Sequence, residues 1–207
     1  MKIDTNDMLN SIIQNIEQLS HVKSEDIPNI DLYMDQVTTF METQLDSTKR
    51  YEEDKILTKT MINNYAKNNL LPPPDKKKYS KEHQLILIFI YYFKNILSIR
   101  DIEKLLNPLS ERYFNKDIGF TLTDVYDEVW NLEPGRKELL IEDVKKMYET
   151  TKDTFMQAPE TDREMLQIFS LICSLAFDVY IKKQLIEKII DEIPETETDK
   201  KEKKDKK

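Results

Sequence analysis

Glycine is nearly absent from this chain, and its scarcity constrains the fold more than any other feature. Only two of the 207 residues are glycine, whereas 34% are charged. The tight turns between neighbouring β-strands commonly need a positive φ angle, which glycine adopts most readily. A sheet-rich fold is therefore disfavoured, and the sequence predicts an all-α, predominantly helical protein. A chain of this length can also bury a sizeable core.

The block at residues 57–106 carries most of the information about function. It contains, in order, a short helix with a polar face at 59–68, three prolines at 72–74, a basic segment at 75–79, and two helices at 81–96 and 99–106. Proline lacks a backbone amide and disfavours helical geometry in the preceding residue. We therefore expect residues 71–74 to end the first helix, and Asn107-Pro108 to end the last.

This block resembles the DNA-binding head of MerR-type regulators. The corresponding stretches are Asn69-Leu70-Leu71-Pro72, Lys77-Lys78-Tyr79-Ser80 and Ser98-Ile99-Arg100-Asp101-Ile102. Together with residues 30–37, the pattern is also similar to the uncharacterised bacterial domain-of-unknown-function family 1836. The resemblance covers about residues 27–109 and implies a MerR-like winged helix-turn-helix with a short basic wing. The expected connection at 46–56 is longer than the turn of ordinary MerR-type heads.

The resemblance makes the helix at residues 59–68 a candidate recognition helix. Thr58 is a good N-cap, and the apolar residues Met61, Ile62, Tyr65 and Ala66 share its inward face. The outward face carries the candidate DNA-binding residues Lys59, Thr60, Asn63, Asn64 and Lys67. Asparagine can make two hydrogen bonds to adenine, and lysine can reach guanine or phosphate. MerR-type heads usually have Arg-Tyr in place of Asn63-Asn64, and an ordinary solvated helix face is the alternative.

The basic segment supplies the remaining candidate DNA-binding residues, Lys76, Lys77, Lys78 and Tyr79, in an expected short extended wing. By resemblance, Lys77 takes the place of a phosphate-binding arginine, and Tyr79 anchors the base of the wing. Packing alone is the alternative role for Tyr79. Residues 58–81 hold six lysines and one acid, although the whole chain has a net charge of −8. A local basic face on an acidic protein suits a sequence-selective binder, and a solvated lysine-rich loop is the alternative.

The apolar run at residues 85–93 has the β-branched and aromatic composition of a buried strand. The family pattern instead favours a helix that Ser80 caps and that is apolar on all sides. Such a helix must be covered on every side. We expect the C-terminal half or a partner subunit to cover it.

Other helices are predicted from apolar spacing. They lie at 1–22, with Met8, Ile12, Ile16 and Leu19 on one face, and at 31–45, 121–132, 138–155 and 162–192. The expected segments are an N-terminal helix and linker at 1–26, the MerR-like head at 27–109, a C-terminal helical domain at 110–193 and a disordered charged tail at 194–207. The helix at 162–192 has two alternative roles: to join two subunits, or to cover residues 85–93.

The cellular setting is inferred from cysteine content and apolar runs. Cys173 is the single cysteine and lies in an apolar stretch, so we expect a small core residue, no intramolecular disulfide and a reducing compartment. No secretory signal is visible, and the longest apolar run is shorter than the roughly 20 residues of a membrane-spanning helix. A cytoplasmic protein without a membrane partner is expected.

Little in the sequence supports catalysis. The two histidines, His21 and His83, have no neighbouring ligand or carboxylate constellation, and His83 is expected at the surface. No glycine-rich loop is present to bind phosphate. We therefore predict no catalytic residue, no metal site, no cofactor and no enzymatic activity.

Two functional hypotheses remain. In the first, the protein is a transcription regulator that binds double-stranded DNA as a homodimer on a two-fold site. In the second, the same fold serves as a helical protein-interaction or adaptor module that does not bind DNA. The acidic net charge and the missing Arg-Tyr step are compatible with the second hypothesis.

Overall fold

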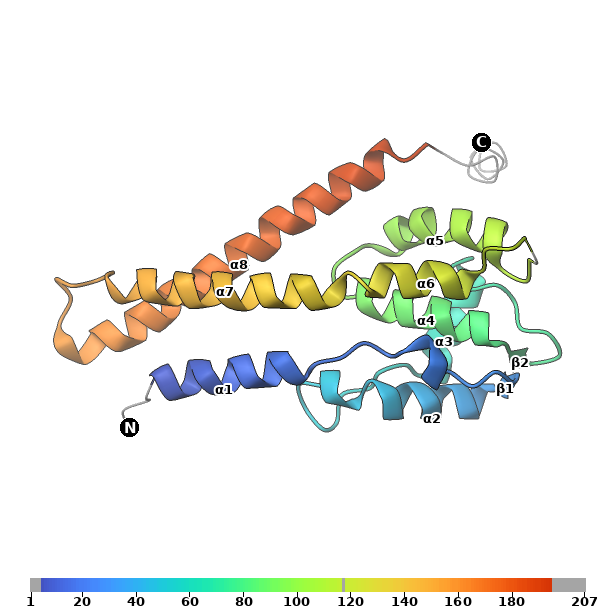
Figure 1. The fold of residues 1–207 in the computed structure, drawn as a ribbon, viewed down its shortest axis with the longest axis horizontal. Coiled ribbons are helices and arrows are strands. Elements are labelled where there is room, and N and C mark those ends of the chain that lie inside the picture. Colours follow the sequence, from blue (N-terminus) through green and yellow to red (C-terminus); the bar gives the residue numbers. More distant parts are fainter. Residues whose placement is uncertain (1–4, 117, 195–207) are drawn as a thin grey trace. The chain divides into compact units, whose positions relative to one another are not determined.

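The computed structural model describes residues 5–116 and 118–194. Among these residues helices dominate, and each strand is only two residues long, which confirms the predicted predominantly helical class (Figure 1). The charged tail predicted at 194–207 lies outside the described residues, apart from Pro194.

The described elements are mostly α-helices, together with two short 3₁₀ turns and one small strand pair. They are α1 (Thr5–Gln18), the 3₁₀ turn η1 (Ser24–Asp26), β1 (Leu32–Tyr33), α2 (Met34–Gln44), the 3₁₀ turn η2 (Asp46–Thr48), α3 (Lys59–Lys67), β2 (Lys78–Tyr79), α4 (Lys81–Phe93), α5 (Ile99–Tyr113), α6 (Leu122–Trp130), α7 (Glu133–Lys152) and α8 (Glu160–Glu192).

The chain forms two compact units. Unit 1 comprises residues 1–20 and 130–184, and unit 2 comprises residues 21–129 and 185–207. The expected MerR-like head at 27–109 lies wholly within unit 2, together with most of α6. Each unit has a core of its own.

Helix α4 is the centre of unit 2. Every residue from His83 to Tyr91 is buried, as expected for a helix that is apolar on all sides. The ring of Phe89 meets the ring of Tyr126 in α6 edge to face at 5.4 Å, and the Tyr126 hydroxyl donates a hydrogen bond to the Val22 carbonyl. The predicted helix is confirmed over the strand-like composition, and α6 of the same chain contributes to its cover.

A two-residue antiparallel ladder joins the segment before α2 to the segment after α3. Leu32 pairs with Tyr79, and Tyr33 pairs with Lys78. The Tyr33 amide also donates to Gln36 Oε1 at 2.8 Å, inside the first turn of α2. Helix α2 therefore begins at Met34 rather than at the predicted residue 31, because the ladder holds the preceding residues extended.

Helix α3 ends before the prolines that were expected to stop it. Asn69 adopts a left-handed φ of 55°, and the Leu70 amide donates to the Tyr65 carbonyl at 2.9 Å while the Asn69 amide reaches Ala66 at 3.4 Å. These two bonds form a Schellman cap, which satisfies carbonyls at the helix end. Asparagine tolerates the left-handed conformation better than most residues, so the helix ends there.

Two further prolines lie inside helices, contrary to the sequence prediction. Pro108 lies within α5, which continues to Tyr113, whose ring is 6.0 Å from Phe120. Pro134 lies in the first turn of α7, which begins at Glu133 rather than at the predicted residue 138. A first-turn amide has no helical acceptor, so proline is tolerated there.

Unit 1 consists of α1, α7 and most of α8. Its apolar core cluster contains Leu9, Ile13, Val144, Tyr148 and Leu171. The face of α1 that packs inside unit 1 carries Leu9 and Ile13. Ile12 and Leu19, on the apolar face identified from the sequence, are 45% and 39% exposed in the single chain.

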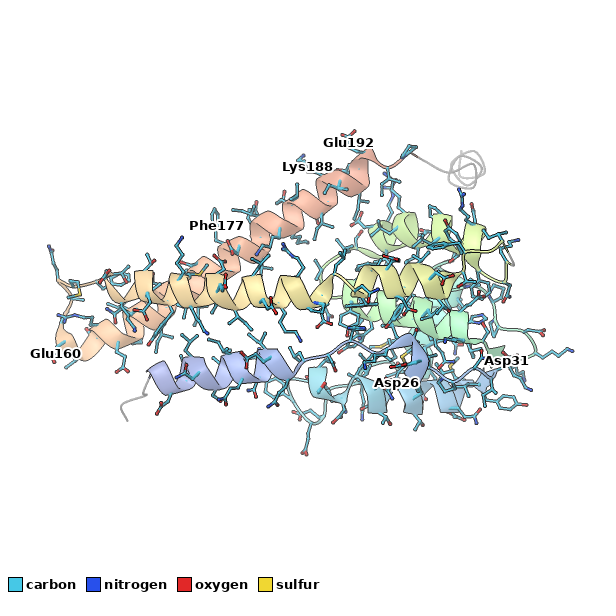
Figure 2. All side chains as sticks on the ribbon, in the orientation of Figure 1. Asp26, Asp31, Glu160, Phe177, Lys188 and Glu192 are labelled. Atoms are coloured by element: carbon cyan, nitrogen blue, oxygen red, sulfur yellow. The ribbon has the colours of Figure 1, made fainter. Side chains whose placement is uncertain are left out.

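Helix α8 spans the predicted range of 162–192 and leaves many apolar side chains exposed (Figure 2). Cys173 is exposed on it, so the prediction of a core cysteine is wrong. Among the described residues, α8 is the one helix long and apolar enough to span a membrane by length and composition alone. This criterion is weak evidence, because core helices of soluble proteins also meet it.

Candidate nucleic-acid interface

The two faces of α3 differ as the sequence predicted. Thr58 caps the helix, with its hydroxyl oxygen accepting a hydrogen bond from the Met61 amide at 3.2 Å. Ile62 and Tyr65 are buried against unit 2, and burial raises the pKa of Tyr65. The opposite face is exposed and consists of Lys59, Thr60, Asn63, Asn64 and Lys67. The buried face therefore fixes which polar groups α3 presents to solvent.

Most of the outward side chains have no partner within the described residues. Thr60, Asn63 and Lys67 have no hydrogen bond or ion pair there, and the hydrogen bond at Asn64 uses its backbone carbonyl, which accepts from Asn68 at 2.8 Å. Lys59 differs, because its ammonium group pairs with the carboxylate of Asp35 in α2. The donors and acceptors of Asn63 and Asn64 are thus available to a ligand, whereas part of the charge of Lys59 is already neutralised.

The basic segment is a tight turn rather than the expected extended wing. Lys76 and Lys77 have positive φ angles of 46° and 67°, and the Lys78 amide donates to the Asp75 carbonyl at 2.8 Å. Two central residues with positive φ are typical of a type I′ turn. The side chains of Lys76 and Lys77 are exposed at its tip. Only Lys78 and Tyr79 at its end are extended, as β2, because the pairing of Asp75 with Lys78 closes the residues before them into a turn.

The two residues after the turn tip lie closer to the protein. Lys78 is half-buried, and its ammonium group lies over the Tyr33 ring at 5.3 Å from the centroid. Tyr79 is 3% exposed, and burial raises the pKa of its hydroxyl. The structure therefore places Tyr79 in the core beneath the turn, where it supports the turn and does not face a surface ligand.

His83 is buried and joins the turn to the helices behind it, contrary to the prediction of a surface residue. The Ser80 amide donates to His83 Nδ1 at 2.9 Å, and His83 Nε2 lies 3.4 Å from the Pro73 carbonyl oxygen. Its ring meets Tyr79 edge to face at 5.4 Å and Phe114 at 4.7 Å. Burial lowers the pKa of His83, although the Pro73 carbonyl opposes this effect.

The sequence contains a signal for this role of His83. Histidine stands at the third position after the capping Ser80, where glutamate or glutamine completes a capping box. An imidazole with an unprotonated Nδ1 can accept the same hydrogen bond. The spacing from Ser80, rather than a neighbouring ligand, is therefore the feature that locates His83 at the start of α4.

The long connection at 46–56 is attached to α4 at its end. Lys94 donates to the Ile56 carbonyl at 2.7 Å, and its ammonium group lies 4.7 Å from the centroid of the Tyr91 ring. Burial lowers the pKa of Lys94. Ile56 and Leu57 are both buried, so the start of α3 is fixed to unit 2 despite the length of the connection.

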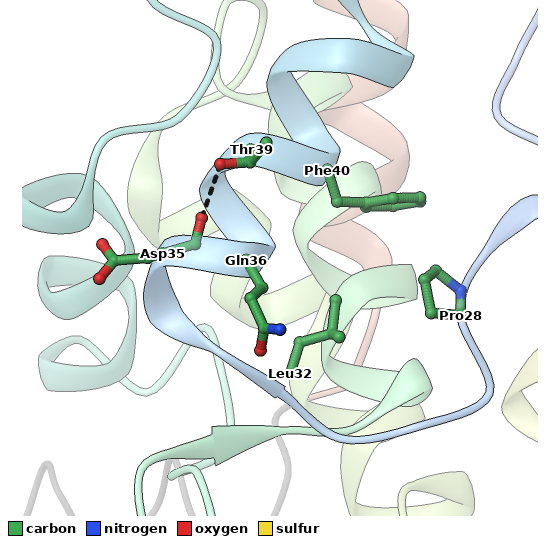
Figure 3. A pocket seen from close by; sticks show the side chains of 6 residues that line it. All are labelled: Pro28, Leu32, Asp35, Gln36, Thr39 and Phe40. Atoms are coloured by element: carbon green, nitrogen blue, oxygen red, sulfur yellow. Dashed lines mark hydrogen bonds between the residues drawn. The ribbon is translucent and has the colours of Figure 1, made fainter.

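A shallow groove of about 420 Å³ lies beside α2 (Figure 3). Pro28, Leu32 and Phe40 supply its apolar surface, together with Asp35, Gln36 and Thr39. The Thr39 hydroxyl donates to the Asp35 carbonyl, and Gln36 is occupied by the Tyr33 amide. The groove therefore offers mainly apolar contact.

Acidic, histidine and cysteine side chains do not cluster in the part of the chain that the structure describes. No group of three or more of them there is arranged to hold a metal ion. Within the described residues, Asp35 of α2 is joined to the polar face of α3 through Lys59, and the turn is joined to the segment before α2 by the pairing of β1 with β2.

The described residues thus define a helical protein whose polar helix face and basic turn belong to one compact unit. The family model for Domain of unknown function (DUF1836) matches residues 22–129, more than half of the chain, and the protein belongs to this family. The resemblance to that family predicted from the sequence is confirmed, and the match extends through most of α6. No curated protein and no solved structure matches the chain.

Proposed function

We propose that this protein is a transcription regulator that binds double-stranded DNA through α3 and the turn at residues 75–78, which we call the lysine turn. The observation that carries the proposal is the exposed face of α3, where Asn63, Asn64 and Lys67 make no side-chain hydrogen bond within the described residues. A buried opposite face keeps these groups directed outward. An α-helix fits the major groove, in which base edges present distinct donors and acceptors.

The chemistry of this face suits the reading of bases. An asparagine side chain carries a donor and an acceptor that match N6 and N7 of adenine, and each such pair discriminates by about 1–3 kcal/mol. Lys67 carries a charge in the last turn of α3 and can reach a base or a phosphate. Sequence preference is therefore assigned to Asn63 and Asn64, with Lys67 beside them.

The lysine turn supplies the contact to the DNA backbone. Lys76 and Lys77 are exposed at its tip, and the ladder of β1 with β2 holds the turn next to α2. The order β1, α2, α3, β2 agrees with a MerR-like head in which the wing follows the recognition helix. Lysine at the place of the wing arginine contributes charge without a bidentate fork.

The adaptor hypothesis is favoured by a different observation, the groove beside α2. Ile30 and Tyr33 are 67% and 54% exposed near Leu32, which lines this groove. Exposed apolar side chains next to a groove are typical of protein interaction sites. In this alternative, the pairing of Lys59 with Asp35 would leave α3 with too little charge to bind DNA.

A salt titration on random-sequence duplex DNA tests the contact to phosphate. Each phosphate contact contributes about −0.9 to the slope of log affinity against log salt. The double variant Lys76→Gln and Lys77→Gln should therefore reduce the magnitude of the slope by about 1.8. The matched control is Lys145→Gln with Lys146→Gln, which removes the same charge from exposed positions on α7. If the slope decreases equally in both double variants, the effect is due to net charge, and the turn does not contact DNA.

Selection of preferred sequences from a pool of random duplexes tests whether α3 reads bases. Asn63→Ala or Asn64→Ala should cost about 1–3 kcal/mol on the preferred site and little on random DNA. Asn10→Ala, on the exposed side of α1, is the matched control and should keep the wild-type preference. If the wild-type protein shows no sequence preference, or if the variants keep the full preference, the regulator hypothesis is rejected in favour of the adaptor hypothesis.

A further inference from the structure

Unit 1 exposes more apolar surface than its small core can explain. Its apolar core cluster, within the described residues, consists of the five buried side chains named above, with Ile141, Met147 and Leu175 packed against it. Small domains are marginally stable even when they bury about 60% of the surface of the unfolded chain. Helix α8 meanwhile leaves large apolar side chains in solvent, and Phe177, labelled in Figure 2, is 62% exposed.

Part of this exposed surface has the spacing of a helix-pairing seam. Met165, Phe169, Ile172, Ala176 and Val179 follow one another at intervals of four, three, four and three residues. All five are exposed, with Met165, Ile172 and Val179 at 63%, 57% and 64%. Alternating intervals of four and three keep one line of side chains facing a second helix, as in a coiled coil. We call these five residues the α8 seam.

The α8 seam is distinct from the face of α8 that packs inside unit 1. Leu171 and Leu175 contact the core that α1 and α7 form, and neither belongs to the seam. Ile186, which is 37% exposed, continues the seven-residue spacing of Met165, Ile172 and Val179. The five residues of the α8 seam span about two heptads, the position four residues after Val179 is occupied by Lys183, and Ile186 resumes the apolar spacing.

A lipid bilayer is a poor occupant for this surface. Leu171 and Leu175 lie in the middle of the apolar stretch of α8, and both pack on a core that includes α7. Helix α7 carries ten charged residues within Glu133–Lys152. Insertion of this stretch into hydrocarbon would bring those charges in with it or break the core, and charged side chains in a bilayer are costly.

A second copy of the same chain fits the seam by its periodicity. Identical seams on two helices are complementary to each other by symmetry, so one patch can serve both subunits of a two-fold dimer. We propose that two copies of this protein pair along the α8 seam, and that this pairing completes the core of unit 1. The pairing rests on α8 alone and holds whether or not α3 binds DNA.

Sedimentation equilibrium tests the pairing with two lysine substitutions of the same residue type on one helix. Ile172→Lys, in the seam, should raise the dimer dissociation constant by at least about 30-fold, the effect of an interface hot spot. Ile181→Lys is the matched control, because Ile181 is 48% exposed on α8 but lies outside the seam. It should leave the wild-type dimer intact, as should the apolar exchange Ile172→Leu.

Three results of binding and sedimentation measurements would overturn the proposal. These are a wild-type monomer at about 100 µM, equal weakening by both lysine variants, and flotation of the wild-type protein with phosphatidylcholine vesicles. Cys173, the only cysteine, gives a second readout that needs no substitution, because it is exposed next to Ile172. Its reaction with a maleimide should be slow at high protein concentration and should accelerate on dilution. A rate independent of concentration contradicts the pairing even if Ile172→Lys fails to fold.

Discussion

The buried imidazole of His83 connects three segments of unit 2 that are separate in the sequence. It accepts from the Ser80 amide, lies beside the Pro73 carbonyl and contacts the Phe114 ring at the end of α5. The first of these bonds needs an unprotonated Nδ1. A neutral His83 therefore belongs to the folded state, and its protonation opposes the arrangement of the lysine turn.

This arrangement predicts a loss of stability in mild acid. Burial lowers the pKa of His83 in the folded state below its ordinary value of 6.5, so below that pH the unfolded chain binds a proton that the folded protein does not. Stability should fall as the pH decreases from 6.5 toward the folded-state pKa, by at most about 1.4 kcal/mol per pH unit. Urea unfolding at about pH 7.5 and pH 5.5 should show a smaller acid loss for His83→Gln than for wild type. Equal losses would show that His83 is not the group responsible.

At the scale of residues, the sequence predicted the two faces of α3 but not the burial of single polar groups. Thr58, Ile62 and Tyr65 were predictable because helical spacing and capping are local. Gln84 is fully buried, and its amide atoms have no hydrogen-bond partner among the described residues. A polar residue inside an apolar run depends on what the rest of the fold places around it, which local patterns do not contain.

At the scale of elements, the lysine turn combines a backbone conformation that lysine disfavours with exposed charge. Left-handed residues other than glycine and asparagine cost about 1–2 kcal/mol each, and such strain is commonly found at functional sites. The type I′ geometry instead favours Asn-Gly. Under the proposed function, the charge of these two lysines is kept at the cost of turn stability.

The double variant Lys76→Asn and Lys77→Gly should therefore change the stability of unit 2 and the affinity for DNA in opposite directions. We expect unit 2 to gain about 1–2 kcal/mol in urea unfolding, because relief of strain at two positions exceeds the chain entropy that the new glycine loses on folding. DNA affinity and its salt dependence should decrease as in the double glutamine variant. The glutamine variant, which keeps side chains at both positive-φ positions, is the control for stability. A stability loss on the Asn-Gly exchange would contradict the assigned turn geometry.

The extent of the elements was predicted less well than their existence. Helices were expected wherever α1 to α8 occur, yet the prolines misled the prediction at three places. Asn69 ends α3 before Pro72, Pro108 lies inside α5, and Pro134 lies in the first turn of α7. Proline restricts only its own neighbourhood, whereas the end of a helix also depends on caps and tertiary contacts such as that of Tyr113 with Phe120.

At the scale of the whole molecule, the two units differ in the extent of their buried apolar cores. Unit 2 buries nine consecutive residues of α4, whereas the apolar core cluster of unit 1 contains five buried side chains in the described chain. The sequence predicted a long apolar helix after the head and left its partner open. Periodicity identifies apolar faces of α8 that could pair with another helix. Only the structure shows which of these faces already packs inside unit 1.

If a second copy completes unit 1, its unfolding should depend on protein concentration. Association with the folded state alone stabilises it by mass action. Calorimetry at about 5 µM and about 200 µM should show a lower transition that moves upward by about 4–8 °C, as expected for a domain of this size. The transition of unit 2 should stay in place. In Ile172→Lys the lower transition should lose this dependence, and a wild-type transition that does not move would rule out coupled pairing.

The ladder between β1 and β2 also sets an order of events during folding. Its two paired positions join segments on either side of α2 and α3, and so short a strand pair is not stable by itself. Closure of the intervening loop costs entropy, so α2 and α3 must pack before the ladder can persist. We therefore expect the turn to become attached to β1 late in folding, so that an incompletely folded chain presents its lysines on a turn that the ladder does not yet hold.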